Sequence, residues 1–196
     1  MKISLIMPTI NRRDELIIFL QSLESQTYKN FELIVLDQNP GDFITEIIEG
    51  FQKHLDIKYI KSSEWGLSLN RNEGLIIADG DIIAFPDDDC EYPEDILEKV
   101  VDFFEKNKEY RIFSCRTLER GKDYGTGIMA TEEAEITYSN VEETVKSITF
   151  FVNYKLEDLT LFDTDLGVGA YFGSGEETDY VLELLHKGFR GRYFPD

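Results

Sequence analysis

The sequence predicts a single α/β domain in which a mostly parallel central sheet is flanked by helices. Three observations predict this fold class. The chain has 196 residues, a length that fits one domain. Hydrophobic residues make up 42% of the chain, which is enough to build a core. Short apolar runs alternate with stretches of helical periodicity, and this alternation is typical of βαβ units.

The first half of the chain carries the clearest alternation of strands and helices. Residues 3–7 form an apolar run that Pro8 ends, and residues 31–36 form a second run that turn-forming residues end. Each run is typical of a buried strand. Asn11 is expected to cap the helix between them. The other elements predicted in this half are helices over 43–51 and 67–78 and strands over 57–60 and 82–85.

The second half is less regular. An amphipathic helix is predicted from Pro93 to Asn107. Residues 141–154 fit either a helix or a strand. The other features predicted in this half are a strand over 112–115, a long loop over 118–140 that Gly121, Gly125 and Gly127 interrupt, a glycine-rich segment over 167–175, a last helix over 177–187 and a short strand over 193–194.

Composition narrows the class of function. The net charge is −19, and this acidic balance argues against nucleic-acid binding, which needs a basic surface. Cys90 and Cys115 are too few for a disulfide framework, so we expect a reducing compartment. Residues 1–7 are too short for a signal peptide, and no apolar run approaches the roughly 20 residues that span a bilayer. We therefore expect a soluble, cytoplasmic chain that can act at the inner face of the membrane by peripheral association.

Three consecutive aspartates, Asp87, Asp88 and Asp89, directly follow the predicted strand over 82–85. Ligands of open α/β sheets bind outside the carboxyl ends of the strands. Oxygen ligands suit a hard cation, Mg²⁺ or Mn²⁺, which one or two carboxylates typically hold together with substrate phosphates. The run therefore predicts a metal site. The alternative is a solvated acidic loop, which is common in a chain this acidic.

Four motifs stand in the order that is typical of one enzyme family, and together they cover essentially the whole chain. The four motifs are Met7-Pro8-Thr9 and Asn11-Arg12-Arg13 with Phe31 to Asp37, Gly66 with Asn70-Arg71-Asn72-Glu73-Gly74, Phe85-Pro86-Asp87-Asp88-Asp89 with Pro93, and Gly175-Glu176-Glu177-Thr178-Asp179-Tyr180 with Gly188 and Tyr193-Phe194-Pro195. In these motifs the chain resembles the GT-A-type family 2 of inverting glycosyltransferases, and the resemblance implies a GT-A (Rossmann-like) fold.

The resemblance implies a role for particular residues. Asp89 would ligate Mn²⁺ or Mg²⁺, with Asp87 as a supporting ligand and Asp88 pointing away. Glu177 would be the general base, with Glu176 and Asp179 as the next candidates. The residues expected at the donor nucleotide are Thr9, Asn11, Arg13, Asp37, Arg71, Asp87 and Asp88.

Each of these roles has a plainer alternative. Thr9 could cap a helix, Asp37 could form an Asx turn, and Arg71 could be an exposed helix residue paired with a neighbouring glutamate. Glu176 and Glu177 could serve only the helix macrodipole, because acidic residues are favoured at a helix start.

The chain departs from the family pattern at two positions. Glu177 stands where the family usually has an aspartate, and Glu183 stands where it usually has an arginine. Family members also continue past the position of Asp196, so a naturally short member and a truncated chain both remain open. The resemblance divides the domain into a nucleotide-sugar-binding half, residues 1–115, and an acceptor and catalytic-base half, residues 116–196.

The function that the resemblance implies is inverting transfer of a sugar from a nucleoside-diphosphate sugar, with UDP-sugars favoured, to a hydroxyl acceptor. The acceptor would be a saccharide or a lipid-linked saccharide in surface polysaccharide or glycan synthesis. One alternative is a sugar nucleotidyltransferase, although residues 8–13 lack the glycines of a triphosphate loop. The other is a non-catalytic module that binds nucleotide sugars.

Overall fold

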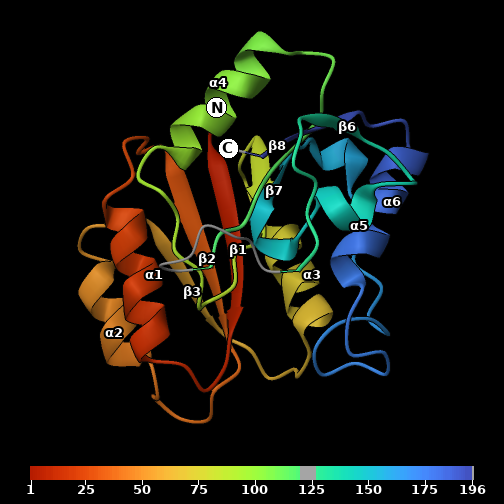
Figure 1. Ribbon diagram of the computed structural model, residues 1–196. Helices are drawn as coiled ribbons and strands as arrows, with labels where there is room; N and C mark the ends of the chain where they lie inside the picture. The colour runs from red at the N-terminus through yellow and green to blue at the C-terminus, as the bar shows by residue number, and fades with distance from the viewer. Residues whose placement is uncertain (120–126, 196) are drawn as a thin grey trace.

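The computed structural model describes residues 1–119 and 127–195 (Figure 1). One sheet runs through the molecule in the strand order β3-β2-β1-β4-β7-β5-β8-β6. The strands are β1 (Ile3–Thr9), β2 (Phe31–Asp37), β3 (Ile57–Lys61), β4 (Ile82–Ala84), β5 (Ile112–Cys115), β6 (Ala134–Ile136), β7 (Phe150–Asn153) and β8 (Gly191–Phe194). The helices are α1 (Asp14–Glu24), α2 (Thr45–Phe51), α3 (Leu67–Ile77), α4 (Ile96–Lys106), α5 (Val141–Thr144) and α6 (Glu176–His186), with short 3-10 turns at Ser147–Thr149 and Leu156–Asp158.

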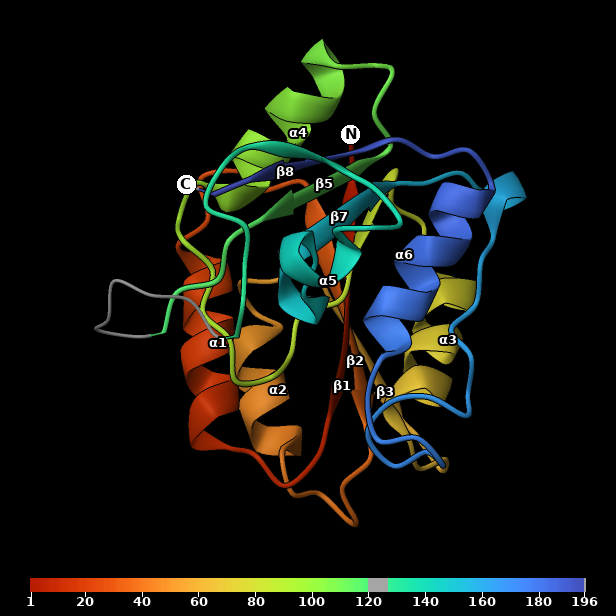
Figure 2. The same ribbon diagram turned by 45° about the vertical axis from the view of Figure 1, so that its right-hand side comes forward.

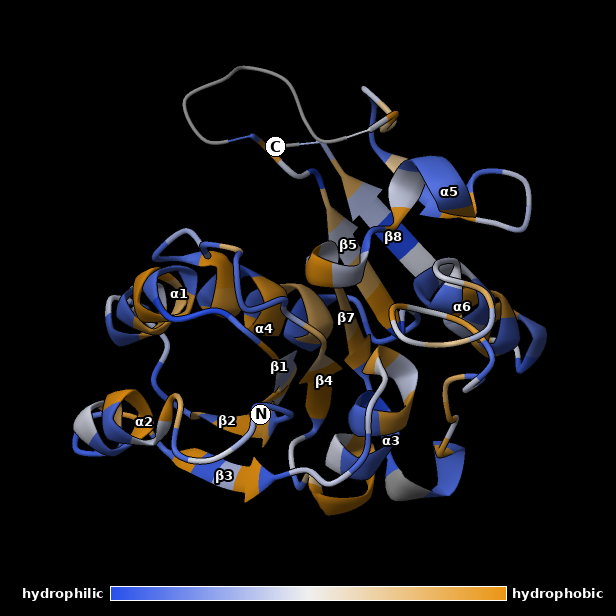
Figure 3. Cartoon of the chain, turned by 90° about the horizontal axis from the view of Figure 1, so that it is seen from below, coloured by the Kyte–Doolittle hydropathy of each residue, from blue (hydrophilic) through white to orange (hydrophobic). Residues whose placement is uncertain are grey.

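The first four strands pair in parallel, with β1 between β2 and β4. Every residue of β1 and β2 is buried, which explains why both read as continuous apolar runs rather than alternating ones. Helices cover both faces of the sheet (Figures 2 and 3): α1, α2 and α4 pack on one core cluster, and α3, α5 and α6 pack on the other. The fold confirms the predicted α/β domain with a mostly parallel sheet.

The second half contains the antiparallel pairs and the elements that sequence patterns missed. Strand β7 runs antiparallel to β4 and β5, and it occupies the end of the segment 141–154, whose beginning is helix α5. Strand β6 pairs with β8 inside the predicted loop over 118–140. Three residues are too few for a periodic pattern, so their strand character depends on β8. Gly121 and Gly125 lie outside the described residues.

The entry into α1 differs from its prediction. The helix begins at Asp14 with Arg13 at the N-cap and no side-chain cap hydrogen bond, so Asn11 does not cap it. Instead Asn11 has a φ of 56°, a left-handed conformation that asparagine tolerates better than most residues. Its backbone N–H donates to Asn39 Oδ1 at 2.6 Å. Asn11 therefore shapes the turn between β1 and α1.

None of the helices in the described residues is both long and apolar enough to cross a membrane.

Gly74 lets α3 lie close to the sheet. A Cβ at this position would lie 2.3 Å from Ile6 Cγ2 and 3.2 Å from Leu36 Cδ2, and both of these side chains are fully buried. We expect Gly74→Ala to lower the free energy of unfolding by roughly 1–3 kcal/mol, because the methyl group overpacks the contact between α3 and β1. Urea unfolding measures the change.

Gly50 of α2 provides the matched control. A Cβ there would meet nothing within 4 Å. Gly50→Ala is therefore expected to raise the free energy of unfolding by about 0.5–1 kcal/mol, because alanine is the better helix former. Equal stabilisation by the two substitutions would show that α3 does not depend on the close approach.

Candidate active site

A cavity of about 220 Å³ opens at the carboxyl ends of β1 and β4. Figure 3 views the sheet from this end. Ligands of parallel α/β sheets bind at this edge. The cavity brings together the end of β1, the acidic run after β4, the start of α3 and the glycine-rich loop before α6. Its lining residues are Pro8, Thr9, Ile10, Arg12, Gln38, Trp65, Gly66, Leu67, Asp87, Asp88, Asp89 and Val168.

The three aspartates have different surroundings. Asp88 is buried and accepts a hydrogen bond from Thr9 Oγ1 at 2.7 Å. Asp87 and Asp89 keep side chains that are 39% and 41% exposed at the cavity. Burial raises the pKa of Asp87 and of Asp88 above the ordinary value for aspartate. Thr9 therefore positions Asp88, and the alternative that it caps a helix is wrong.

Arg12 places a positive charge on this acidic run. Its Nη1 lies 2.7 Å from Asp89 Oδ2, and its Nε lies 3.2 Å from Asp88 Oδ1. Sequence reasoning missed Arg12 and selected Arg13. The guanidinium of Arg13 lies over the Phe43 ring, 5.4 Å from its centroid, and Arg13 does not line the cavity. The motif alone does not distinguish the two adjacent arginines. The donor role of Arg13 stays a prediction.

Arg71 is fully buried on the inner face of α3, beside Gly74 and Leu75. Its Nη1 donates to Glu176 Oε1 at 3.1 Å and its Nη2 donates to Asp87 Oδ1 at 3.1 Å. The alternative that Arg71 is an exposed helix residue is wrong, because the apolar side of α3 carries it into the core. Arg71 joins the acidic run after β4 to the first turn of α6. Its contact with the donor stays a prediction.

Further contacts hold the Arg71 guanidinium in place. Nη2 also donates to Ser147 Oγ. The guanidinium lies 5.9 Å from the centroid of the Phe85 ring and 5.4 Å from that of Phe162. Its Nε has no hydrogen-bond partner among the described residues. The arginine is thus surrounded by aromatic rings and depends on its two carboxylates for charge balance.

The three acidic residues at the start of α6 differ in environment. Glu176 is buried against Arg71, whereas Asp179 is exposed. Glu177 is half-buried, and burial followed by the neighbouring charge of Glu176 raises its pKa above the ordinary glutamate value. Burial, together with Asp163 and Glu183, also raises the pKa of Asp179. All three lie in the first turn, where the macrodipole also favours them.

Asp37 ends β2 with both carboxylate oxygens engaged. Oδ1 accepts from the backbone N–H of Asn39 at 2.8 Å, and Oδ2 accepts from Tyr59 Oη at 2.6 Å and from Lys61 Nζ at 2.7 Å. Burial favours a higher pKa for Asp37, but these hydrogen bonds outweigh it and lower the pKa. The Asx-turn interpretation is therefore confirmed, and a contact between Asp37 and a nucleotide base stays a prediction.

The glycine-rich loop between β7 and α6 packs against the segment that starts α3. The backbone N–H of Leu67 donates to Val168 O at 2.9 Å. Gly169 has a φ of 87°, and a Cβ there would lie 2.5 Å from Trp65 Nε1. Glycine is therefore required here by both the backbone conformation and the contact with the indole. Trp65 and Val168 are cavity residues that the sequence patterns did not mark.

The acidic run is the candidate ligand set for a divalent cation. Within residues 1–119 and 127–195, no group of three or more His, Cys, Asp or Glu side chains is arranged to hold a metal ion. Asp87 and Asp89 nevertheless offer half-exposed carboxylates at the cavity. Hard cations that bind phosphates are often held by one or two carboxylates, with phosphate and water oxygens completing the shell. The donor set fits Mg²⁺ or Mn²⁺ bound in that way.

The chain is similar to known glycosyltransferases over different lengths. It is 30% identical over 190 residues to an uncharacterized glycosyltransferase of Rickettsia conorii, covering 97% of this chain and 31% of the relative. It is 38% identical over 93 residues to the GalNAc(5)-diNAcBac-PP-undecaprenol beta-1,3-glucosyltransferase of Campylobacter jejuni, covering 46% of this chain and 30% of that enzyme. The chain thus spans about a third of the length of each relative.

Two solved structures share the fold. An S. aureus TarS fragment in complex with UDP-GlcNAc superposes with a TM-score of 0.79 at 20% identity, covering 100% of this chain and 56% of the fragment. The mannosyltransferase PcManGT from Pyrobaculum calidifontis, in complex with GDP-Man and Mn²⁺, superposes with a TM-score of 0.75 at 19% identity, covering 99% of this chain and 55% of that enzyme. At residues 4–160 the chain matches Glycosyl transferase family 2, and it therefore belongs to that family.

Proposed function

We propose that this chain carries the catalytic site of an inverting glycosyltransferase that moves a sugar from a nucleoside-diphosphate sugar to a hydroxyl acceptor. The observation that carries the proposal is the buried bridge through Arg71. It holds Asp87, at the cavity, and Glu176, beside the candidate base, in one arrangement. A donor site and a base are both needed in a single displacement at a sugar carbon.

Glu177 is the proposed general base. Its carboxylate accepts the proton of the acceptor hydroxyl while that oxygen forms a bond to the anomeric carbon. The bond from the anomeric carbon to the phosphate oxygen breaks on the opposite side, and the nucleoside diphosphate leaves with the electron pair. One displacement inverts the configuration. A raised pKa suits this role, because a base works best when its pKa lies near the working pH.

Asp89 and Asp87 are the proposed ligands of Mn²⁺ or Mg²⁺. A bound cation would stabilise the negative charge on the departing diphosphate. The GDP-Man and Mn²⁺ complex of the mannosyltransferase supports metal use, and the UDP-GlcNAc complex of TarS supports a UDP-sugar donor. The Arg12 guanidinium pairs with carboxylate oxygens of Asp88 and of Asp89, and Asp89 is one of the two proposed ligands. The guanidinium already neutralises part of the acidic run.

Asp89→Asn is expected to weaken Mn²⁺-dependent binding of UDP by roughly 10- to 100-fold, because one charged oxygen ligand is lost and the charge of the ligand set tunes cation affinity over decades. Calorimetry of UDP with and without Mn²⁺ measures the change. The matched control is Asp95→Asn, because Asp95 lies at the surface and pairs with Lys99 on α4. If the two variants bind UDP alike, Asp89 does not ligate the metal.

Turnover is tested with UDP-, GDP- and dTDP-sugars, Mn²⁺ and a panel of saccharide acceptors. The anomeric configuration of the product, read by NMR, distinguishes inversion from retention. Release of pyrophosphate from a nucleoside triphosphate and a sugar phosphate would instead identify a nucleotidyltransferase. Donor binding without turnover for any acceptor would identify a binding module. Failure of every donor to bind would remove the proposal.

The proposed biological setting is the synthesis of surface polysaccharide or another glycan on a saccharide or lipid-linked saccharide. The name of the Campylobacter jejuni relative, which describes an undecaprenol-linked acceptor, supports this setting. We place the reaction in the cytoplasm at the inner face of the membrane. Residues 1–115 form the proposed donor-binding half, and residues 116–196 form the acceptor and catalytic-base half.

A further inference from the structure

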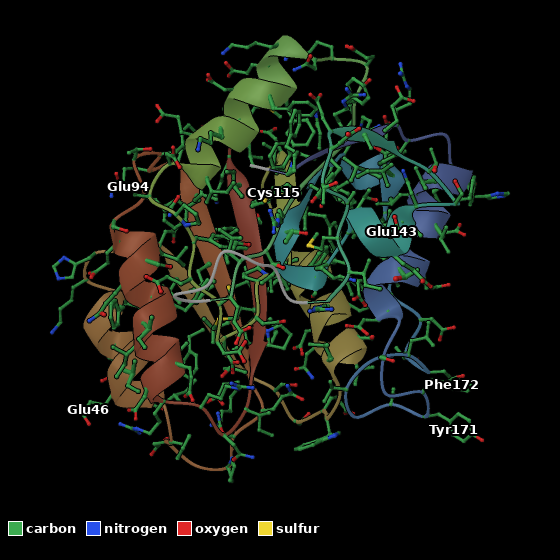
Figure 4. All side chains as sticks on the ribbon, viewed as in Figure 1. Glu46, Glu94, Cys115, Glu143, Tyr171 and Phe172 are labelled. Carbon is green, nitrogen blue, oxygen red and sulfur yellow. The ribbon has the colours of Figure 1, made fainter. Side chains whose placement is uncertain are left out.

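Four exposed hydrophobic side chains lie on the two segments that meet at the cavity. Trp65 is 62% exposed, Val168 64%, Tyr171 85% and Phe172 57%. We call these four residues the aromatic rim. Figure 4 shows Tyr171 and Phe172 at the tip of the loop before α6, with their rings directed away from the body of the protein. Such exposure of large rings costs hydration free energy and is typical of a binding surface.

The rim is held in shape by specific contacts. The Trp65 indole lies against Gly169, where even a Cβ would clash. The Tyr171 and Phe172 rings meet edge to face, with their centroids 4.8 Å apart. The backbone N–H of Phe172 donates to Asp165 O at 2.8 Å, which closes the loop on itself. The rings are therefore displayed by an ordered loop.

The rim continues from the cavity. Trp65 and Val168 line the same cavity as Asp87 and Asp89, and Tyr171 and Phe172 extend the loop from Val168 toward solvent. A molecule that reached the cavity from the side of this loop would pass over the rim. In the proposed transfer the donor occupies the acidic side, so this approach is left open to the second substrate.

The charges around the aromatic rim indicate which kind of ligand it binds. Residues 156–186 contain no lysine or arginine and include Asp163, Asp165 and the acidic first turn of α6, in a chain of net charge −19. Membrane-surface segments combine aromatic residues with basic ones that attract anionic lipid. The loop before α6 lacks that partner charge, and Arg12, the basic residue among those that line the cavity, is already paired with Asp88 and Asp89, so the rim suits a neutral ligand.

A pyranose fits this chemistry. Its C–H groups form a weakly positive face, and the face of an aromatic ring is weakly negative. Its hydroxyl groups are donors for which nearby carboxylates are acceptors. We infer that the aromatic rim binds the acceptor as a neutral pyranose unit, with Trp65 and Tyr171 as the two principal contacts. This inference rests on the proposed transfer reaction and adds the residues that contact its second substrate.

Trp65 is the only tryptophan of the chain, so its fluorescence reports on the rim directly. The protein is titrated with N-acetylglucosamine, methyl glucoside, cellobiose and lactose while Trp65 emission is recorded. We expect a saturable change in emission with at least one of them. Tyr171→Ala should weaken that binding roughly three- to tenfold, as expected for loss of one aromatic contact. Phe172→Leu provides a second, milder variant.

Tyr138→Ala is the matched control, because Tyr138 is 61% exposed and follows β6. It should leave the saccharide titration unchanged. The inference is overturned if no saccharide changes the emission of Trp65, or if Tyr138→Ala weakens binding as much as Tyr171→Ala does. It is also overturned if vesicles of phosphatidylcholine and phosphatidylglycerol shift the emission whereas the saccharides do not.

Calorimetry of UDP with Mn²⁺ on the same samples separates this inference from the proposed function. Binding of UDP without any response to the saccharides would leave the transfer proposal intact and overturn the inference that the rim binds the acceptor. A response to the saccharides without binding of UDP would keep the rim as a carbohydrate site and overturn the proposed transfer reaction.

Discussion

Glu177→Gln is expected to lower kcat by roughly 10²- to 10⁴-fold, which is the usual contribution of a positioned general base. Glutamine keeps the size of the side chain and cannot take up the proton. Binding of UDP with Mn²⁺ should stay nearly unchanged, because none of the proposed donor contacts lies on α6. Single-turnover kinetics measure the chemical step, and calorimetry measures donor binding.

Asp179→Asn is the matched control for this substitution. Asp179 lies in the same first turn of α6 but is exposed. If the acidic turn serves only the macrodipole, the two variants should lose similar, small amounts of stability and little kcat. Near wild-type kcat in both variants would therefore support helix capping and rule out Glu177 as the base, whereas loss of kcat in Asp179→Asn alone would assign the base to Asp179.

The pH dependence gives a second test of Glu177. A base acts in its deprotonated form, so activity should rise as the pH passes upward through its pKa. Burial and Glu176 raise that pKa, so the acid limb of kcat/KM should lie above the ordinary glutamate pKa of about 4.3. The limb should disappear from the residual activity of Glu177→Gln. An unchanged limb in that variant would assign it to another group.

Arg71→Met is expected to lower the free energy of unfolding by roughly 3–5 kcal/mol, the usual effect of removing one partner from a buried ion pair. The variant leaves Glu176, whose side chain is 8% exposed, without its cation. The double variant Arg71→Met/Glu176→Gln should recover part of the loss, because it also removes the uncompensated carboxylate. Urea unfolding of the single and double variants measures both effects.

Arg190→Met serves as the surface control for Arg71. Arg190 pairs with Glu135 at the protein surface, where both side chains are about half exposed. Solvent screens such a pair, so its loss should change stability little. A small effect at Arg71 as well would show that the bridge is not a structural link between the acidic run and α6.

Much of the fold could be predicted because its first half consists of local patterns. The apolar runs that became β1 and β2 and the periodic segments that became α3 and α4 contain their own signal, since each buries a continuous or one-sided apolar surface. Strand β6 could not be predicted in this way. It is three residues long, and the strand that it pairs with, β8, lies more than fifty residues later in the chain.

The candidate site also combines features that the sequence predicts with contacts that only the structure shows. The sequence by itself determined the residue types, the acidic run after a buried strand and the order of motifs that placed the chain in its family. Only the tertiary structure decided that Arg12 rather than Arg13 meets the aspartates, that Arg71 is buried between Asp87 and Glu176, and that Trp65 meets the loop before α6. These contacts join segments that are distant in the chain. Their partners are set by how helices pack on the sheet, and residue order alone does not encode that packing in a local pattern.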